Sequence, residues 1–297
     1  MLKINVASYL YSCYVNAIDS QAQAQPLVKW AGGKRQLQER ILATFPPFTG
    51  TYFEPFLGGA AIFFALNPKK AVLSDVNEGL VNLYKCVQAD HLELLAECKK
   101  LETKYNKLNL DGQSELFYRI RESYNSSDRS GISTAANFLL LNKAGFNGIY
   151  RENASGGFNV PFGKRSTLVL ATEENLELAA KSLKKAKISL RGFESVENVA
   201  QPGDLVYFDP PYVPLSITSA FTSYSKGGFG EAHQVELSRV FRALSDKGVH
   251  VALSNSKTPL IEKLYKGFNL HELSATRQIS AKTSGRSSVT ELLVTNF

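Results

Sequence analysis

Short apolar segments of strand length alternate with segments of helical period at both ends of this 297-residue chain. Such alternation favours an α/β fold, in which a mostly parallel sheet carries helices on both faces. We expect strands in TYFEPF, AVLS, KISLR, DLVYF, VHVALS and VTELLVTNF, which occupy residues 51–56, 71–74, 187–191, 204–208, 249–254 and 289–297.

The residues between the two groups of strands differ in character. They are helical in period and rich in Lys, Arg and Asn, and their Gly/Asn-rich stretch KAGFNGIYRENASGGFNVPFGK (143–164) predicts a β-hairpin. We therefore expect an N-terminal extension at 1–25, a sheet domain formed by 26–75 and 187–297, and a mainly helical inserted domain at 76–186.

The composition limits the classes of protein to consider. No apolar run is long enough to cross a membrane as a helix, and the net charge of +7 favours a polyanionic partner. The three cysteines lack CxxC spacing and the four histidines lack an HExxH pattern, so we expect neither a metal site nor disulfides. Polar residues interrupt the apolar part of the extension, which argues against an export signal and favours a cytoplasmic protein.

Two glycines follow the strand at 51–56, where a helix is expected to begin. Gly58 and Gly59 bring backbone close to a ligand at a helix N-terminus, and Asp75, at the end of the next strand, could accept hydrogen bonds from ribose hydroxyls. The same residues equally fit a plain turn in which Asp75 caps the following helix. Taken alone, they suit a nicotinamide enzyme nearly as well as one that uses S-adenosylmethionine.

A buried strand runs directly into Asp209-Pro210-Pro211-Tyr212. Open α/β sheets bind ligands at this edge, and prolines present carbonyl groups without competing N–H donors. A carboxylate beside a rigid carbonyl forms a site of acceptors only, which suits a neutral group with two donors, such as the exocyclic amine of adenine or cytosine. Tyr212 offers a face for the planar base. The alternative is an Asp-Pro turn that merely closes a strand.

Acceptors on both amine protons also favour methylation of the nitrogen. They return electron density to a lone pair that is otherwise delocalised into the ring, and transfer then needs orientation and electrostatic stabilisation but no metal and no covalent intermediate. Methylation at cytosine C5 would need a cysteine nucleophile, typically after proline. Cys13, Cys86 and Cys98 follow Ser, Lys and Glu instead.

The chain resembles the DNA adenine methyltransferase (Dam) family over residues 26–297. The resemblance lies in LVKWAGGK, YFEPFLGGAA, LSDVN, LNKAGFNGIYRENASGGFNVPFGK, VYFDPPYVPLS and FTSYSKGGF, which occur in the order of that family. It implies a Rossmann-like class I enzyme, monomeric in solution. Such an enzyme transfers a methyl group from S-adenosyl-L-methionine to N6 of an adenine flipped out of double-stranded DNA within GATC, either alone or in restriction-modification.

The same resemblance implies roles for individual residues. Asp209 and Pro210 would hold the target amine, and Tyr212 would stack on the adenine, with Pro211 completing the motif. The inserted domain would recognise the DNA target, with Lys29 and Arg151 contacting guanines. The cofactor site would consist of Trp30, Ala31, Gly32, Lys34, Glu54, Phe56, Gly58, Asp75 and Asp209. The other DNA contacts would come from Phe146, which enters the base stack, and from Asn147, Ile149 and Pro161.

Some of these assignments have simpler explanations, and other functions stay open. Phe146, Ile149 and Pro161 also suit ordinary packing within a hairpin. The same acceptor site would serve a methyltransferase acting on adenine in RNA, cytosine N4 or another amine. A sequence-specific DNA-binding protein without catalysis is a further alternative, against which the intact Asp209 motif and Asp75 argue.

Overall fold

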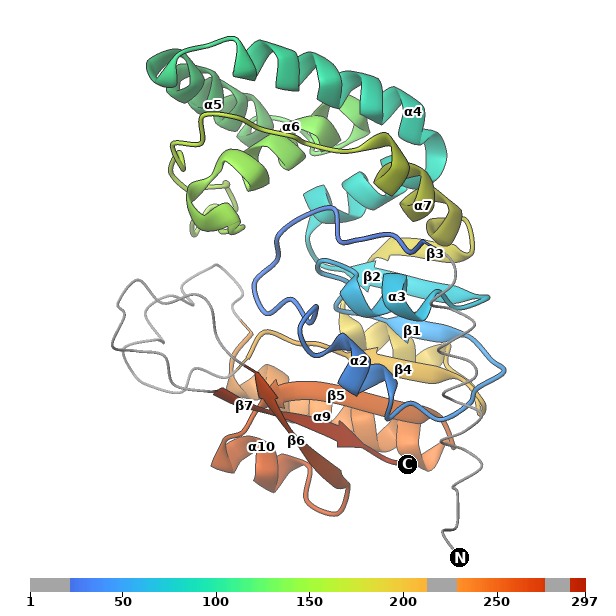
Figure 1. Cartoon of the computed structure of the whole chain (residues 1–297). Coiled ribbons are helices and arrows are strands. Elements are labelled where there is room, and N and C mark those ends of the chain that lie inside the picture. The colour runs from blue at the N-terminus through green and yellow to red at the C-terminus, as the bar shows by residue number, and fades with distance from the viewer. Residues whose placement is uncertain (1–21, 213–228, 276–288) are drawn as a thin grey trace, which may run out of the picture.

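The computed structural model describes residues 22–212, 229–275 and 289–297 (Figure 1). These residues include β1 (Tyr52–Glu54), β2 (Ala71–Asp75), β3 (Ala186–Leu190), β4 (Leu205–Phe208), β5 (His250–Ser256), β6 (Asn269–Ala275) and β7 (Val289–Thr295). The strands form one sheet in the order β3-β2-β1-β4-β5-β7-β6. All neighbours from β3 to β5 pair in parallel, whereas β7 lies antiparallel between β5 and β6. The predicted α/β fold with a mostly parallel sheet is confirmed.

Helices cover both faces of the sheet because successive side chains of a strand point to opposite sides. Tyr52 and Tyr207 belong to a core with α2 (Gln38–Leu42), α3 (Ala61–Leu66) and the helices between β2 and β3. Phe53 and Phe208 belong to a second core, opposite the first. Its other members include side chains of β5 and β7 and of η2 (Phe193–Asn198), α9 (Glu231–Asp246) and α10 (Pro259–Leu264).

Half of the helices in the described residues lie between β2 and β3 in sequence and beyond β3 in space (Figure 1). They are α4 (Glu78–Asn106), α5 (Leu110–Asn125), α6 (Gly131–Ala144), η1 (Phe146–Gly148) and α7 (Glu173–Leu183). Asn77 caps α4 by accepting a hydrogen bond from the Leu80 N–H, and the helix is interrupted at Asp90 (φ −151°, ψ 81°). The apolar α6 packs against α4 and α5, and its buried side chains form the centre of this helical region.

The Gly/Asn-rich stretch folds back on itself as predicted, but its pairing is sparse. Its arms meet at two isolated antiparallel bridges, Gly145 with Phe162 and Glu152 with Phe158. Between these bridges, Asn159 donates its backbone N–H to the carbonyl of Arg151 at 3.0 Å. The hairpin therefore presents η1 and Arg151 on loop backbone rather than on regular strands.

Two strands differ from the sequence expectation. β1 ends at Glu54 because Pro55 cannot donate to a neighbouring strand. β6 was not expected, since NLHELSA shows no clear alternation; as an edge strand it pairs only with β7, and Leu270 remains 39% exposed. Residues 1–21 of the predicted extension, with 213–228 and 276–288, lie outside the described part. No helix in the described part is long and apolar enough to span a membrane.

Candidate active site

The predicted catalytic and cofactor residues meet where the strand order reverses. β1 lies between β2 and β4, and the chain runs outward from this position in both directions. Such a reversal leaves a crevice at the carboxyl ends of the strands, which is where open α/β sheets bind ligands. Glu54, Asp75 and Asp209 end or directly follow β1, β2 and β4, so one edge of the sheet holds all three carboxyl groups.

Asp209 belongs to a compact charged cluster. Lys34 Nζ lies 2.7 Å from Asp209 Oδ1 and 3.9 Å from Glu291 Oε2, and only 2% of the lysine side chain is exposed. The ammonium group also lies 4.5 Å from the ring centroid of Tyr212. The Tyr212 hydroxyl in turn donates to Glu291 Oε2 at 2.6 Å. Asp209 and Tyr212, the two side chains predicted to be catalytic, are thus held by Lys34, from the loop before α2, and by Glu291, from β7.

Burial raises the pKa of two carboxyl groups at this edge of the sheet, those of Asp209 and Glu54. It raises the pKa of Asp209 to about 6, although the nearby Lys34 ammonium opposes the rise. It raises the pKa of Glu54 to about 8, because desolvation outweighs the hydrogen bond that Glu54 Oε2 accepts from the Tyr52 hydroxyl at 2.7 Å. At neutral pH, Asp209 is therefore mainly an ionised acceptor, whereas Glu54 is mainly a neutral acid.

Two amide side chains hold the Pro-Pro segment in place through the carbonyl of Pro211. The carbonyl of Pro211 accepts a hydrogen bond from Gln234 Nε2 at 3.1 Å, and Gln234 Oε1 accepts one from Asn255 Nδ2 at 3.0 Å. Gln234 and Asn255 are both fully buried. The carbonyl of Pro211 is therefore engaged inside the protein. Of the two proline carbonyls, that of Pro210 is the one the sequence assigns to a substrate amine.

The glycine turn after β1 is closed by Asp75. Its Oδ2 accepts the Gly58 N–H at 3.0 Å and its Oδ1 accepts the Asn77 N–H at 2.9 Å, while Asn77 caps α4. Asp75 therefore holds the turn but does not cap the helix. Gly58 has φ +46°, and a Cβ there would lie 2.8 Å from Cδ1 of Trp30. The turn thus depends on glycine for both its conformation and its contact with Trp30.

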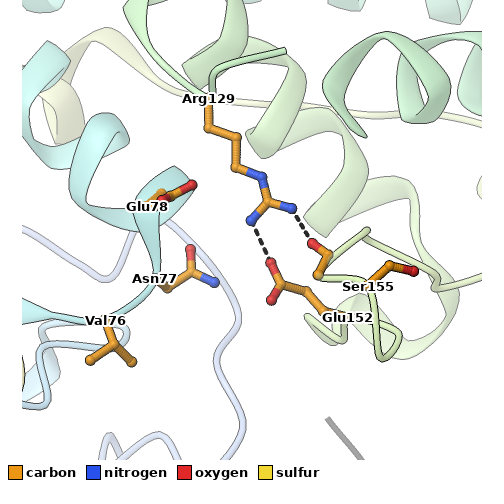
Figure 2. A pocket seen from close by; sticks show the side chains of 7 residues that line it. Val76, Asn77, Glu78, Arg129, Glu152 and Ser155 are labelled. Carbon is orange, nitrogen blue, oxygen red and sulfur yellow. Dashed lines mark hydrogen bonds and ion pairs between the residues drawn. The ribbon is translucent and has the colours of Figure 1, made fainter. Parts of the chain in front are cut away.

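A polar cavity begins directly after Asp75 (Figure 2). Its volume is about 370 Å³, and Val76, Asn77 and Glu78 face Arg129, Glu152, Ser155 and Gly156 across it. Arg129 Nη1 donates to Glu152 Oε1 at 2.6 Å, as drawn in Figure 2. Asp209 does not line this cavity. None of the residues that line the cavity was predicted as a site residue, so the open cavity beside β2 is distinct from the charged cluster beyond β4.

The remaining predicted cofactor residues lie in the loop before α2 and directly after β1. Trp30 stacks on Tyr150 with ring centroids 5.3 Å apart, and Phe56 stacks on Phe193 at 5.4 Å. Ala31 is exposed, as is Gly32, whose carbonyl accepts a hydrogen bond from Lys34 Nζ at 2.5 Å.

The predicted DNA contacts are gathered on the hairpin and on the loop that precedes Trp30. Phe146 is 53% exposed and donates its N–H to the carbonyl of Pro161, and the exposed Asn147 occupies a left-handed turn at φ 57°. Arg151 is exposed, with Nε donating to Asn159 Oδ1 at 2.7 Å. The other members of the group are Lys29 and Pro161, which are exposed, and Ile149, which is partly buried against the core.

Several residues of this region were not identified from the sequence. Glu291 gives a readable signal, because it is a single acid within the otherwise apolar strand VTELLVT. Gln234 and Asn255 give none, since their roles depend on how α9 and β5 pack. The described residues contain no group of three or more His, Cys, Asp or Glu side chains that could hold a metal ion.

Comparison with known proteins identifies the family of the chain. The family model of D12 class N6 adenine-specific DNA methyltransferases matches residues 30–279. The chain belongs to that family. It is 43% identical to the type II methyltransferase M1.LlaDCHI of Lactococcus lactis subsp. cremoris over 92% of this chain and 95% of the relative.

More distant members of the family align over a similar length. The methyltransferase is 37% identical to the type II methyltransferase M.MjaIII of Methanocaldococcus jannaschii, over 93% of this chain and all of the relative. It is 34% identical to a DNA adenine methylase of Vibrio cholerae, over 90% of this chain and 94% of the relative. The chain is therefore an adenine-specific DNA methyltransferase, as its motifs predict.

Proposed function

We propose that this methyltransferase transfers a methyl group from S-adenosylmethionine to N6 of an adenine turned out of duplex DNA, within GATC. The observation that carries the proposal is the position of Asp209, a partly buried carboxylate at the reversal of the sheet that shares the Lys34 ammonium with the ring of Tyr212. This arrangement offers an acceptor and an aromatic face to a single planar amine.

The protein's own lysine supports this assignment. The Lys34 ammonium group donates to Asp209 Oδ1 and lies over the Tyr212 ring, so a nitrogen with N–H donors already occupies this position. An adenine amine would take the same two partners, with the Pro210 carbonyl as the second acceptor. Because the pKa of Asp209 is about 6, its carboxylate is available at neutral pH to draw electron density toward the amine nitrogen.

The cofactor assignment is supported by charge and by space. S-adenosylmethionine supplies the methyl group on a positively charged sulfur, and the two acidic side chains Asp209 and Glu291 beside the single Lys34 ammonium leave an excess of negative charge that suits a cation. Asp75 would hold the ribose, and the cavity in Figure 2 beside it is large enough for part of a nucleoside. Trp30 would close the site over the glycine turn.

The helical region at 76–186 would serve as the DNA target-recognition domain. Arg151 and Lys29 are exposed and would read guanines, since an arginine fork matches the two acceptors of guanine in the major groove. Phe146 is exposed by 53% next to the tight turn at Asn147, which suits a wedge that fills the gap left by a flipped base. That the enzyme is monomeric and cytoplasmic remains a prediction from the sequence.

The proposal is tested with methyl-labelled S-adenosylmethionine and two duplexes that differ only at one GATC. Label on adenine N6 in the GATC duplex alone is the expected result. Equal labelling of both duplexes would contradict the assigned target sequence, and no labelling despite cofactor binding would indicate another amine substrate.

The variant Asp209→Ala provides the matched control for the site. It should bind DNA but lose methyl transfer, because the amine loses its charged acceptor. Transfer at the wild-type rate would overturn the role given to Asp209, and no cofactor binding by the unaltered protein would point to a DNA-binding protein without catalysis.

A further inference from the structure

Asn142 joins two segments that the proposed function assigns to DNA reading. It lies near the end of α6 and its side chain is fully buried. Asn142 Oδ1 accepts the Lys29 N–H at 3.0 Å, and Asn142 Nδ2 donates to the Lys29 carbonyl at 2.9 Å and to the Gly148 carbonyl at 3.2 Å. One side chain thus fixes the loop before Trp30 to the η1 turn of the hairpin.

The two segments are in direct contact at the point where Asn142 joins them. Gly148 has φ +65°, and a Cβ at this position would lie 2.6 Å from Cδ of Lys29. Only glycine allows this approach without a shift of the lysine. Immediately beyond the junction, Trp30 of the first segment stacks on Tyr150 of the second. The relative position of the two segments is therefore set by the contact of Gly148 with the Lys29 side chain, by the Asn142 amide and by one stacked pair.

Three other asparagines of the chain also pair with backbone N–H and carbonyl groups, as Asn142 does with Lys29. Asn106 pairs with both backbone groups of Leu168, Asn125 with those of Phe158, and Asn175 with those of Gln25. Each of these pairs holds one residue. Asn142 differs because its second donor reaches Gly148, so it satisfies two separate segments. A side chain with two donors and one acceptor is required, and Asp, Leu or Ala cannot supply it.

We propose that Asn142 is a positioning residue for sequence selectivity. By holding Lys29 and the η1 turn together, it fixes the distance between the lysine and the hairpin residues Arg151 and Phe146. Base discrimination requires both cations to meet their base edges at once, so a loose junction would weaken the penalty for a wrong base more than it weakens binding to phosphate. This proposal rests on the proposed DNA-reading roles of Lys29 and Arg151.

The test measures selectivity in Asn142→Ala, with Asn106→Ala as the control. Wild-type selectivity is first measured on a duplex library, as the ratio of kcat/KM for the preferred site to that for sites with one changed base pair. We expect this ratio to fall roughly tenfold in Asn142→Ala, since one wrong base pair typically costs about 1–3 kcal/mol. Asn106→Ala should keep the wild-type ratio. The ratio does not depend on the folded fraction, so loss of stability alone leaves it unchanged.

A second comparison separates positioning from simple support of the fold. If Asn142 acts through Lys29, the loss of selectivity in Asn142→Ala should be smaller in a Lys29→Met background, because the two changes remove the same contact. Additive losses would overturn the proposal, as would a selectivity ratio within twofold of wild type in Asn142→Ala. Should that variant not fold, Gly148→Ala, whose Cβ would displace the Lys29 side chain from the same junction, should lower the ratio to a similar degree.

The failure of this proposal is distinguishable from failure of the proposed function. Wild-type protein that prefers another adenine site contradicts the GATC assignment, but the role of Asn142 is then tested on that site by the same ratio. If the wild-type protein methylates all sites equally, it has no sequence selectivity, and the proposed role of Asn142 is then refuted as well.

Discussion

Replacing Tyr212 by Phe is expected to slow methyl transfer although the stacking face is retained. The change removes the hydroxyl that donates to Glu291 Oε2 at 2.6 Å. A hydrogen bond to a charged group contributes about 1.5–3 kcal/mol, which corresponds to a rate effect of about 10- to 150-fold if all of it serves to orient the ring. We expect a loss within this range in the rate of single-turnover methylation.

Glu291 is the second arm of this test. The variant Glu291→Gln keeps an acceptor for the Tyr212 hydroxyl but removes the charge, which also lies 3.9 Å from Lys34 Nζ. It should therefore cost less than Tyr212→Phe. In the double variant, the two losses should not add, because both act on one hydrogen bond.

Methylation by the four proteins is measured in single turnover with labelled cofactor, on a duplex that carries one target adenine. Opening of the base pair is followed separately, with 2-aminopurine as the target base. Losses that add to within about 0.5 kcal/mol would refute the reasoning, since residues without shared partners behave that way. Unchanged methylation by Tyr212→Phe would likewise show that β7 does not orient the ring.

Three further perturbations test other parts of the site. The rate of single-turnover methylation should fall as pH drops through about 6, because Asp209 must be ionised to accept the amine N–H and its pKa is raised to about 6 by burial; a profile that stays flat down to pH ~4, near the usual aspartate pKa, would contradict this. Gly58→Ala should weaken cofactor binding roughly tenfold, because alanine at φ +46° costs about 1–2 kcal/mol and its Cβ would displace Trp30. The affinity is measured by fluorescence titration of Trp30, the single tryptophan of the chain, and wild-type affinity would refute the contact. Arg151→Ala should relax discrimination at one guanine by about 1–3 kcal/mol, measured on duplexes changed at single positions, whereas equal weakening on all sequences would indicate a phosphate contact.

The sequence was most informative where local pattern and chemistry coincide. The alternation of strands and helices predicted the α/β class, and the strand that ends at Asp209 was placed within one residue of β4. Strands β2 and β4 are short, mostly apolar segments bounded by polar residues, and β3 alternates apolar and polar residues; both patterns depend little on the partner strands. The edge strand β6 escaped prediction because pairing with β7, rather than its own side chains, makes NLHELSA extended.

Contacts between distant parts of the chain were beyond the reach of sequence patterns. Lys34 was assigned to the cofactor, yet its nearest charged partner is Asp209, from a strand end far along the chain. The hydrogen bond of Tyr212 with Glu291 and the junction at Asn142 arise in the same way. Such pairings depend on sheet order and on helix packing, which periodicity does not reveal.

The connection between β2 and β3 has a consequence for how this enzyme family diversifies. The two strands are hydrogen-bonded neighbours, so the helical region between them begins and ends at adjacent positions of one sheet. Topologically, it is a crossover connection that has grown. Exchange or lengthening of this segment leaves the strand order, the acidic strand ends and Lys34 where they are. If this segment reads the DNA target, as proposed above, its exchange between relatives should change the target sequence while the strand order of the sheet is retained.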